Sequence, residues 1–212
     1  MTSFPEHLKD RYLRFRFRHF DANRDHYEDL ATNGQSPDVM IVSCCDSRCD
    51  PETIFSAMPG ELFVARNVAN LIPPYETGGG FHGISAALEF AVLNLRVKHI
   101  VVMGHSGCGG IKAALNRDAA KQTEAQFISR WMSMLDDARA GLMMGNQTVD
   151  RNELAVKLER EGVRVSLANL RTFPFVADQE RAGQLSICGS HFDIASGQLT
   201  VLDEAANEYL AV

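Results

Sequence analysis

Residues 39–48, with the sequence VMIVSCCDSR, join an apolar run to a cluster of polar side chains. Residues 100–108 (IVVMGHSGC) repeat this arrangement later in the chain. Short apolar runs rich in Val and Ile, each followed by turn residues, are typical of buried strands. In an open α/β sheet, ligands bind at the carboxyl ends of the strands. The two polar clusters are therefore expected to lie together at one functional site.

Strands and helices alternate along the rest of the chain. Further strands are expected at residues 61–65, 98–104, 184–188 and 198–202, and helices at 5–20, 50–57, 84–97, 109–115, 123–142 and 152–170. The last two strands flank Ser196-Gly197, which favours antiparallel pairing between them. This alternation predicts an α/β fold in a single domain, with a central, mostly parallel β-sheet flanked by helices. Residues 1–33 are expected to form an N-terminal helical arm and residues 34–212 the α/β core.

The composition excludes several classes of protein. The chain has 212 residues and a formal charge of −6, which argues against a nucleic-acid partner. It has no apolar run of about 18 residues, so no membrane span is expected. The first ten residues contain no apolar core of a signal peptide, which favours a cytoplasmic location. Five cysteines are an odd number, and metal binding or catalysis is a more natural use for them than a disulfide framework.

Cys44, His105 and Cys108 offer two thiolates and one imidazole. This donor set favours zinc over magnesium or calcium. Three protein ligands leave a fourth position for water or substrate, as in catalytic zinc sites. Because two thiolates cancel the charge of the ion, the pKa of a bound water should exceed the value of about 7 known for an all-histidine site. Activity is therefore expected to rise through the alkaline range.

Asp46 and Arg48 follow the ligand Cys44 by two and four positions. A carboxylate can accept the proton of a zinc-bound hydroxide and so orient its lone pair. A guanidinium can hold that carboxylate through two parallel hydrogen bonds. An isolated Asp-x-Arg would be read as a surface salt bridge, but its place directly after a candidate ligand favours the catalytic interpretation.

These residues together resemble the β-class carbonic anhydrases. CCDSR at 44–48 is similar to the family's Cys-[Ser/Ala]-Asp-Ser-Arg signature, and HSGCGG at 105–110 to its His-x-x-Cys-Gly-Gly. The connecting stretch GELFVARNVANL at 60–71 is also similar. GQSP at 34–37, Val68 and PPY at 73–75 resemble the plant-type branch. The close similarity covers residues 35–115.

The resemblance implies a zinc lyase that reversibly hydrates carbon dioxide to bicarbonate and a proton, through attack of zinc-bound hydroxide oriented by an Asp-Arg dyad. One Zn²⁺ per chain would be held by Cys44, His105 and Cys108, with Asp46 and Arg48 as the catalytic dyad. It also implies a homo-oligomer, at least a homodimer or else a tetramer. The N-terminal arm is expected to pack on a second subunit through its aromatic face. From the residues alone, solvated arginines on that arm are the alternative.

The substrate-binding residues are also implied by the resemblance. The side-chain amide of Gln35 and the backbone N–H of Gly109 would donate to substrate oxygens. An apolar wall suited to carbon dioxide, partly contributed across the dimer interface, would be formed by Phe63, Val68 and Phe90.

Two departures from the family pattern stand out. Phe90 replaces the tyrosine of the plant enzymes, so no phenol hydroxyl is available there. The bacterial branch with a second, regulatory bicarbonate site has a tryptophan, an arginine and a tyrosine, where this chain has Ile41, Arg66 and Phe192. That regulatory site is expected to be absent or much weakened.

Two alternative functions stay open. Hydrolysis of carbonyl sulfide or carbon disulfide would use the same zinc site and similar chemistry. A non-catalytic zinc-binding module would show a broken dyad or a fourth protein ligand, and it is disfavoured because Asp46 and Arg48 are both present. The sequence does not decide whether Asp46 itself binds the zinc in a closed resting state.

Overall fold

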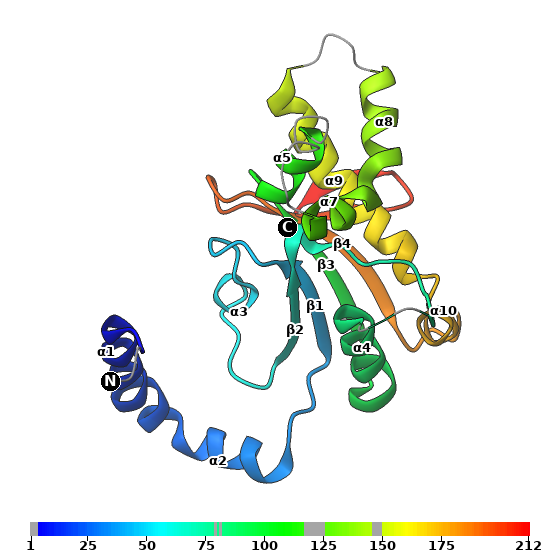
Figure 1. Cartoon of the computed structure of the whole chain (residues 1–212). Helices are drawn as coiled ribbons and strands as arrows, with labels where there is room; N and C mark the ends of the chain where they lie inside the picture. Colours follow the sequence, from blue (N-terminus) through cyan, green and yellow to red (C-terminus); the bar gives the residue numbers. More distant parts are fainter. Residues whose placement is uncertain (1–3, 79, 81, 117–125, 146–149) are drawn as a thin grey trace. The chain divides into compact units, whose positions relative to one another are not determined.

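Six strands form one sheet in the order β2-β1-β3-β4-β5-β6 (Figure 1). The computed structural model describes residues 4–78, 80, 82–116, 126–145 and 150–212. The strands are β1 (Val39–Cys44), β2 (Leu62–Asn67), β3 (His99–His105), β4 (Ser186–Phe192), β5 (Leu199–Asp203) and β6 (Glu208–Ala211). Strands β1 to β4 pair in parallel, while β4–β5 and β5–β6 pair antiparallel. The predicted α/β fold with a mostly parallel sheet is confirmed. The antiparallel pairing expected for residues 184–188 and 198–202 is also confirmed, as β4 and β5.

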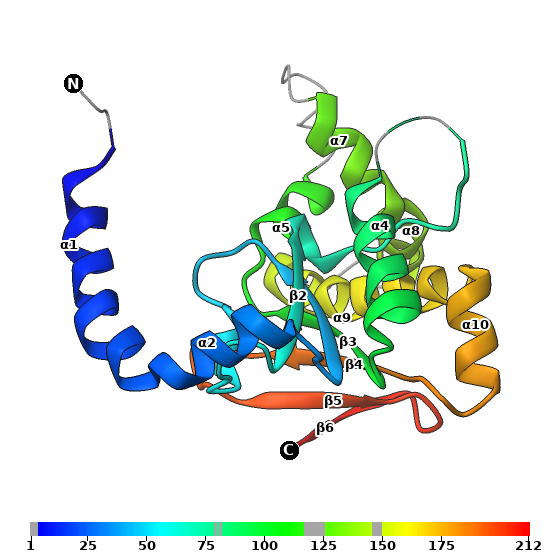
Figure 2. The same cartoon turned by 90° about the horizontal axis from the view of Figure 1, so that it is seen from below.

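The chain changes direction across the sheet at β1. From β1 it passes to β2 on one side, and from β2 it crosses to β3 on the other side of β1. Such a reversal in strand order opens a crevice at the carboxyl ends of the two strands involved, here β1 and β3. At the far edge, β5 and β6 form a hairpin that ends at the C-terminus (Figure 2).

Helices follow most of the expected positions. They are α1 (Glu6–Arg14), α2 (Arg24–Asn33), α3 (Pro51–Ile54), α4 (Gly83–Glu89), α5 (Gly109–Leu115), α7 (Gln126–Met132), α8 (Asp136–Gly145), α9 (Arg151–Leu170) and α10 (Pro174–Arg181). Helix α3 begins as its sequence predicts, because the Asp50 side chain accepts the Thr53 N–H and Pro51 occupies the first turn. The first residues of the helix expected at 123–142 lie outside the described residues.

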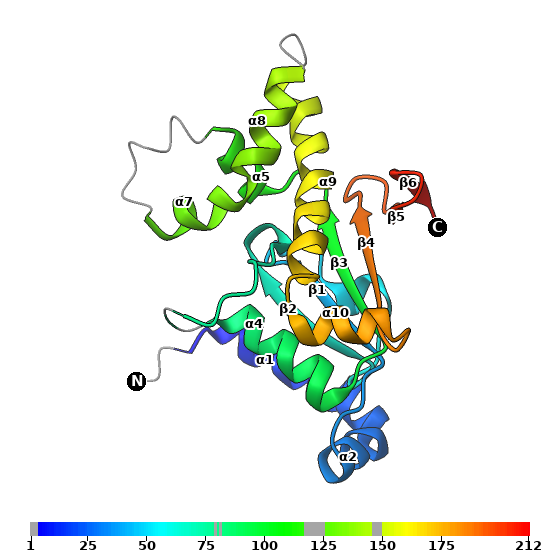
Figure 3. The same cartoon turned by 90° about the vertical axis from the view of Figure 1, so that its right-hand side faces the viewer.

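Helix α9 lies along β3 and β4 (Figure 3). Two glycines on these strands allow the close approach. A Cβ added at Gly104 would come within 2.9 Å of Val163 Cγ2, and one at Gly189 within 2.6 Å of Val163 Cγ1. Val163 and Leu167 thereby join Val102 and Ile187 in the main core cluster.

The apolar segment 84–97 is not buried all round within the single chain. It forms α4 and then a π-helical stretch, η4 (Phe90–Leu95). Leu88 and Ala91 are fully buried, but Phe90 and Leu93 are 45% and 50% exposed. The apolar pattern therefore exceeds what one chain buries, which is typical of a surface that contacts another subunit.

The N-terminal residues form one unit, Met1–Ser36, and the sheet belongs to a second unit, Pro37–Val212. In this first unit α1 continues into a π-helical stretch, η1 (Phe15–Phe20), a short 3-10 turn and α2. Phe20 and Tyr27 stack with ring centroids 4.8 Å apart, while Tyr12 and Phe17 are exposed. The division into an arm (1–33) and a core (34–212) stays a prediction. Among the described residues, no helix combines the length and the apolar character that crossing a bilayer requires.

Candidate metal centre

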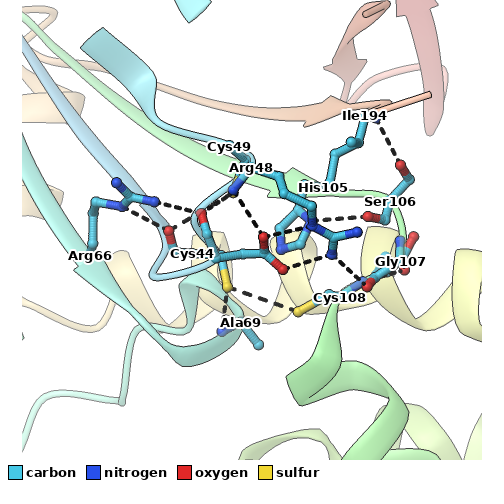
Figure 4. A network of polar contacts seen from close by, with 12 residues as sticks. Cys44, Arg48, Cys49, Arg66, Ala69, His105, Ser106, Gly107, Cys108 and Ile194 are labelled. Carbon is cyan, nitrogen blue, oxygen red and sulfur yellow. Dashed lines mark hydrogen bonds and ion pairs between the residues drawn. The ribbon is translucent and has the colours of Figure 1, made fainter. Parts of the chain in front are cut away.

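Three metal-binding side chains meet at the crevice between β1 and β3. Cys44 is the last residue of β1, His105 is the last residue of β3, and Cys108 is the N-cap residue of α5. Their donor atoms all lie within 4.8 Å of one another, and the two Sγ atoms are 4.0 Å apart (Figure 4). The structure thus brings together three residues that the sequence places 61 and 64 positions apart.

The histidine is oriented for metal binding. His105 Nδ1 lies 3.0 Å from the carbonyl oxygen of Ser106, and a carbonyl only accepts, so Nδ1 carries the proton. Nε2 is then the ring nitrogen that can coordinate a metal, once the metal displaces any proton on it. This atom is buried and has no hydrogen-bond partner. A buried unpaired nitrogen beside two thiols fits a soft divalent cation such as zinc.

The charges of the group also favour a cation. The hydrogen bond with the Cys108 thiol lowers the pKa of Cys44, and the backbone N–H of Ala69 donates to Cys44 Sγ at 3.3 Å. The same contact with Cys44, together with burial, raises the pKa of Cys108. Burial acts to lower the pKa of His105, but the neighbouring Cys44 and Cys49 thiols raise it to about 10. Metal binding would displace the protons that these groups hold.

Asp46 and Arg48 form a bidentate ion pair next to this group. Arg48 Nε donates to Asp46 Oδ1 at 2.9 Å, and Nη2 donates to Oδ2 at 2.8 Å. The backbone N–H of Arg48 also donates to Oδ1, at 3.1 Å. These bonds hold the pKa of Asp46 well below its usual range, so the carboxylate stays ionised.

Arg66 supports the loop that carries these residues. Its Nε donates to the Cys44 carbonyl at 2.9 Å and its Nη2 to the Asp46 carbonyl at 2.7 Å. Its Nη1 forms an ion pair with Asp50 at 2.9 Å. All three guanidinium nitrogens are therefore engaged in holding the turn between β1 and α3.

The predicted substrate-binding residues fall into two groups. Val68 directly follows β2 and touches the start of α5, since a Cβ at Gly110 would meet Val68 Cγ1 at 2.8 Å. Gly109 is the exposed first residue of α5. Both therefore lie beside the cysteines.

Phe63 on β2 and Phe90 on η4 contact each other, away from the cysteines. Their ring centroids are 5.9 Å apart. In the register of β1 and β2, Phe63 pairs with Met40 whereas Asn67 pairs with Cys44. Four residues of strand separate these pairs by about 13 Å. Within one chain the structure does not bring Phe63 and Phe90 to the cysteines. Gln35 is exposed in the first unit.

Sequence reasoning missed one residue of this region. Glu159, on α9, accepts hydrogen bonds from the backbone N–H groups of Gly107 and Cys108. In the sequence it is one of several charged residues on an amphipathic helix, with no spacing that links it to Cys108. The signal that could have found it is an acidic residue on a helix position that packs against the sheet.

A zinc-type donor set at the switch point of an α/β sheet, with an Asp-Arg pair beside it, defines a class of metal-dependent enzymes. The model of the family described as carbonic anhydrase matches residues 39–199, three quarters of the chain. The chain belongs to the carbonic anhydrase family.

The relatives place it in the β class. Beta carbonic anhydrase 3 of Arabidopsis thaliana is 34% identical over 193 residues, which cover 91% of this chain and 74% of the relative. The structure of the β-carbonic anhydrase CcaA superposes with a TM-score of 0.92 at 30% identity, covering 98% of this chain and 91% of that one. A tetrameric β-carbonic anhydrase of Sordaria macrospora gives a TM-score of 0.82 at 28% identity, with 93% and 95% covered.

Proposed function

We propose that this chain reversibly hydrates carbon dioxide to bicarbonate and a proton, with one zinc ion held by Cys44, His105 and Cys108. The observation that carries the proposal is the group of three donors with the buried, unpartnered Nε2 of His105. When bound, zinc supplies the Lewis acidity that lowers the pKa of a water molecule and makes it a nucleophile near neutral pH.

Asp46 would orient the attacking water. A carboxylate has about four acceptor positions. Arg48 uses two of them on Oδ1 and one on Oδ2, which leaves Oδ2 able to accept a hydrogen from the water. Arg48 donates to both carboxylate oxygens of Asp46. We therefore propose a resting state in which Asp46 is paired with Arg48 and does not bind the metal.

The substrate pocket would be completed by a second copy of the chain. Val68 and the N–H of Gly109 lie beside the donors of their own chain, whereas Phe63 lies about 13 Å away along β2 and Phe90, on η4, contacts Phe63. Phe90 is also 45% exposed. We therefore assign Phe63, Phe90 and Gln35 to the pocket of the partner in a homo-oligomer, a dimer or a tetramer, in which the N-terminal unit packs on the partner.

The test is stopped-flow measurement of carbon dioxide hydration on protein of known zinc content. Asp46→Asn should lose at least about 100-fold in kcat/KM, because the amide cannot accept from the water as a carboxylate does. Asp38→Asn is the matched control, since Asp38 directly precedes β1 at the end opposite Cys44 and forms an exposed ion pair with Lys98.

Two outcomes would contradict the proposal. Full activity of zinc-loaded Asp46→Asn would remove Asp46 from the mechanism. A zinc-loaded wild type that is inactive on carbon dioxide across neutral and alkaline pH would overturn the function itself. Assays with carbonyl sulfide and carbon disulfide on the same sample would then separate the alternative hydrolase from a non-catalytic zinc module.

A further inference from the structure

A buried carboxylate lies directly under the loop that carries Cys108. The Glu159 residue is 3% exposed, and its Oε1 accepts the Gly107 N–H at 2.8 Å and the Cys108 N–H at 3.2 Å. Its Oε2 lies 3.2 Å from Nε2 of His191, a buried residue of β4. Glu159 thus joins α9 and β4 to the metal-binding loop.

The backbone of this loop is shaped to receive an anion. Gly107 has a left-handed φ of +70°, and Cys108 follows with an extended φ of −62° and ψ of 125°. In this conformation two successive N–H groups point at one acceptor, as in the backbone nests that bind anions. Here the acceptor is the Glu159 carboxylate of the same chain. Without Glu159, the N–H of the partly buried Gly107 and that of the buried Cys108 would lose their partner.

The same loop contributes to both parts of the site. Cys108 supplies one of the three donors. The carbonyl oxygen of Gly107 accepts a hydrogen bond from Arg48 Nη2 at 3.3 Å, so the loop also contacts the guanidinium that pairs with Asp46. One carboxylate on α9 therefore fixes the backbone next to a metal ligand and next to the Asp46–Arg48 pair.

Close helix packing makes this reach possible. Gly104 lies directly before His105 on β3, and a Cβ there would approach Val163 Cγ2 at 2.9 Å, His191 Cδ2 at 3.5 Å and the Glu159 carbonyl at 3.6 Å. Because Gly104 has no side chain, the turn of α9 that carries Glu159 can pack directly against β3.

We propose that Glu159, held by His191, is a positioning residue that sets how tightly the Cys108 loop retains the metal. This inference rests on the zinc site of the proposed function, but not on the reaction. Substitutions of groups that orient metal ligands typically cost about 10- to 100-fold in metal affinity. A residue that only stabilises the fold would leave metal release and ligand geometry unchanged.

The test compares zinc release in Glu159→Gln, Glu159→Ala and wild type, by transfer of zinc to a chromophoric chelator. Glu159→Gln keeps the shape but weakens the bonds to both N–H groups, and we expect about 10-fold faster release. Glu159→Ala removes the acceptor, and we expect up to about 100-fold. The visible absorption bands of the cobalt-substituted protein should shift in both variants. Glu161→Gln is the matched control, because Glu161 pairs with Arg164 on the same helix.

Glu159→Gln decides the question even where Glu159→Ala fails to fold. Release within twofold of wild type, with unchanged cobalt bands, would overturn the inference and leave Glu159 with a structural role alone. The zinc content of the wild type is measured first. One zinc per chain with unaffected variants overturns this inference only, whereas a wild type that binds no zinc overturns the proposed function and this inference together.

Discussion

Arg48 holds Asp46 through two parallel hydrogen bonds, Nε to Oδ1 at 2.9 Å and Nη2 to Oδ2 at 2.8 Å. The planar guanidinium matches the carboxylate in both position and direction, which a single ammonium cannot do. The pair keeps Asp46 ionised and orients its carboxylate toward Arg48.

Arg48→Lys should therefore reduce activity although it conserves the charge. The lysine would make one hydrogen bond in place of two, and a displacement of about 1 Å in a reacting group can cost on the order of 100-fold in rate. Stopped-flow kcat/KM at constant zinc content measures the loss. Arg181→Lys, in an exposed pair with Asp178, is the control. Wild-type activity in Arg48→Lys would show that bidentate geometry is dispensable.

Activity should rise from neutral to alkaline pH. Two of the three donors are thiolates, so a bound water should have a pKa above the value of about 7 found with three histidines. Titration of Asp46 should not contribute to this rise in activity, because Arg48 holds the pKa of Asp46 well below its usual range. A profile of kcat/KM that is already flat below neutral pH would contradict this prediction.

Bicarbonate should not bind beside Arg66 as a regulator. Its three guanidinium nitrogens already contact the Cys44 carbonyl, the Asp46 carbonyl and Asp50. Ile41 and Phe192 offer no polar group to an ion there. Crystals soaked in bicarbonate should show no ion at this position, and titration with bicarbonate should show no cooperative inhibition. An ion bound beside Arg66 would refute the prediction.

Leu93→Glu should dissociate the oligomer. Leu93 and Phe90 are 50% and 45% exposed on η4, and a charge placed on an apolar interface is costly to bury. Light scattering after size exclusion should show single chains, and activity should fall because the pocket would lose Phe63 and Phe90 of the partner. Val156→Glu, at an exposed apolar position of α9, should leave the oligomer intact. An unchanged mass for Leu93→Glu would place the interface elsewhere.

Glu204→Gln should lower stability at neutral pH but not in acid. Arg171 donates to both Glu204 oxygens, at 2.8 and 2.9 Å, and lowers the pKa of Glu204. A lowered folded-state pKa stabilises the protein above the unfolded pKa of about 4.3, and this stability is lost as the pH falls through the folded pKa.

For this partly exposed pair the effect should be at most about 1 kcal/mol. Urea unfolding at pH 7 and again near pH 3 measures it, with exposed Glu208→Gln as the control. A difference between wild type and Glu204→Gln that is equally large at both pH values would rule out the ion pair as its cause.

Local sequence patterns predicted the elements with strong local signals. Helix α5 begins and ends where expected, at Gly109 and Leu115, and β1 and β3 follow their apolar runs. The patterns missed α10 and β6, and the π-helical stretches η1 and η4. These elements depend on tertiary packing. A π-helix differs from an α-helix only in that each hydrogen bond spans one residue more, which the apolar pattern does not reveal.

The site was predictable only in part for a similar reason. The donors and the dyad are carried by two short motifs, whereas Glu159 reaches the Cys108 loop from 51 positions away. The separation of Phe63 from Cys44 follows from strand register, which no local spacing reveals. The cytoplasmic location stays a prediction.

The strand order has a consequence for how the chain folds. β1 lies between β2 and β3, and its pairing with β3 joins Val39 to His99, 60 positions further along the chain. Parallel pairing across such a separation must first meet the entropy of closing a long loop and is intrinsically slow. Cys44 and His105 therefore come together only when this long loop closes. Zinc uptake would therefore report the closure of this loop, and until it closes the cysteines of a newly made chain stay open to oxidation.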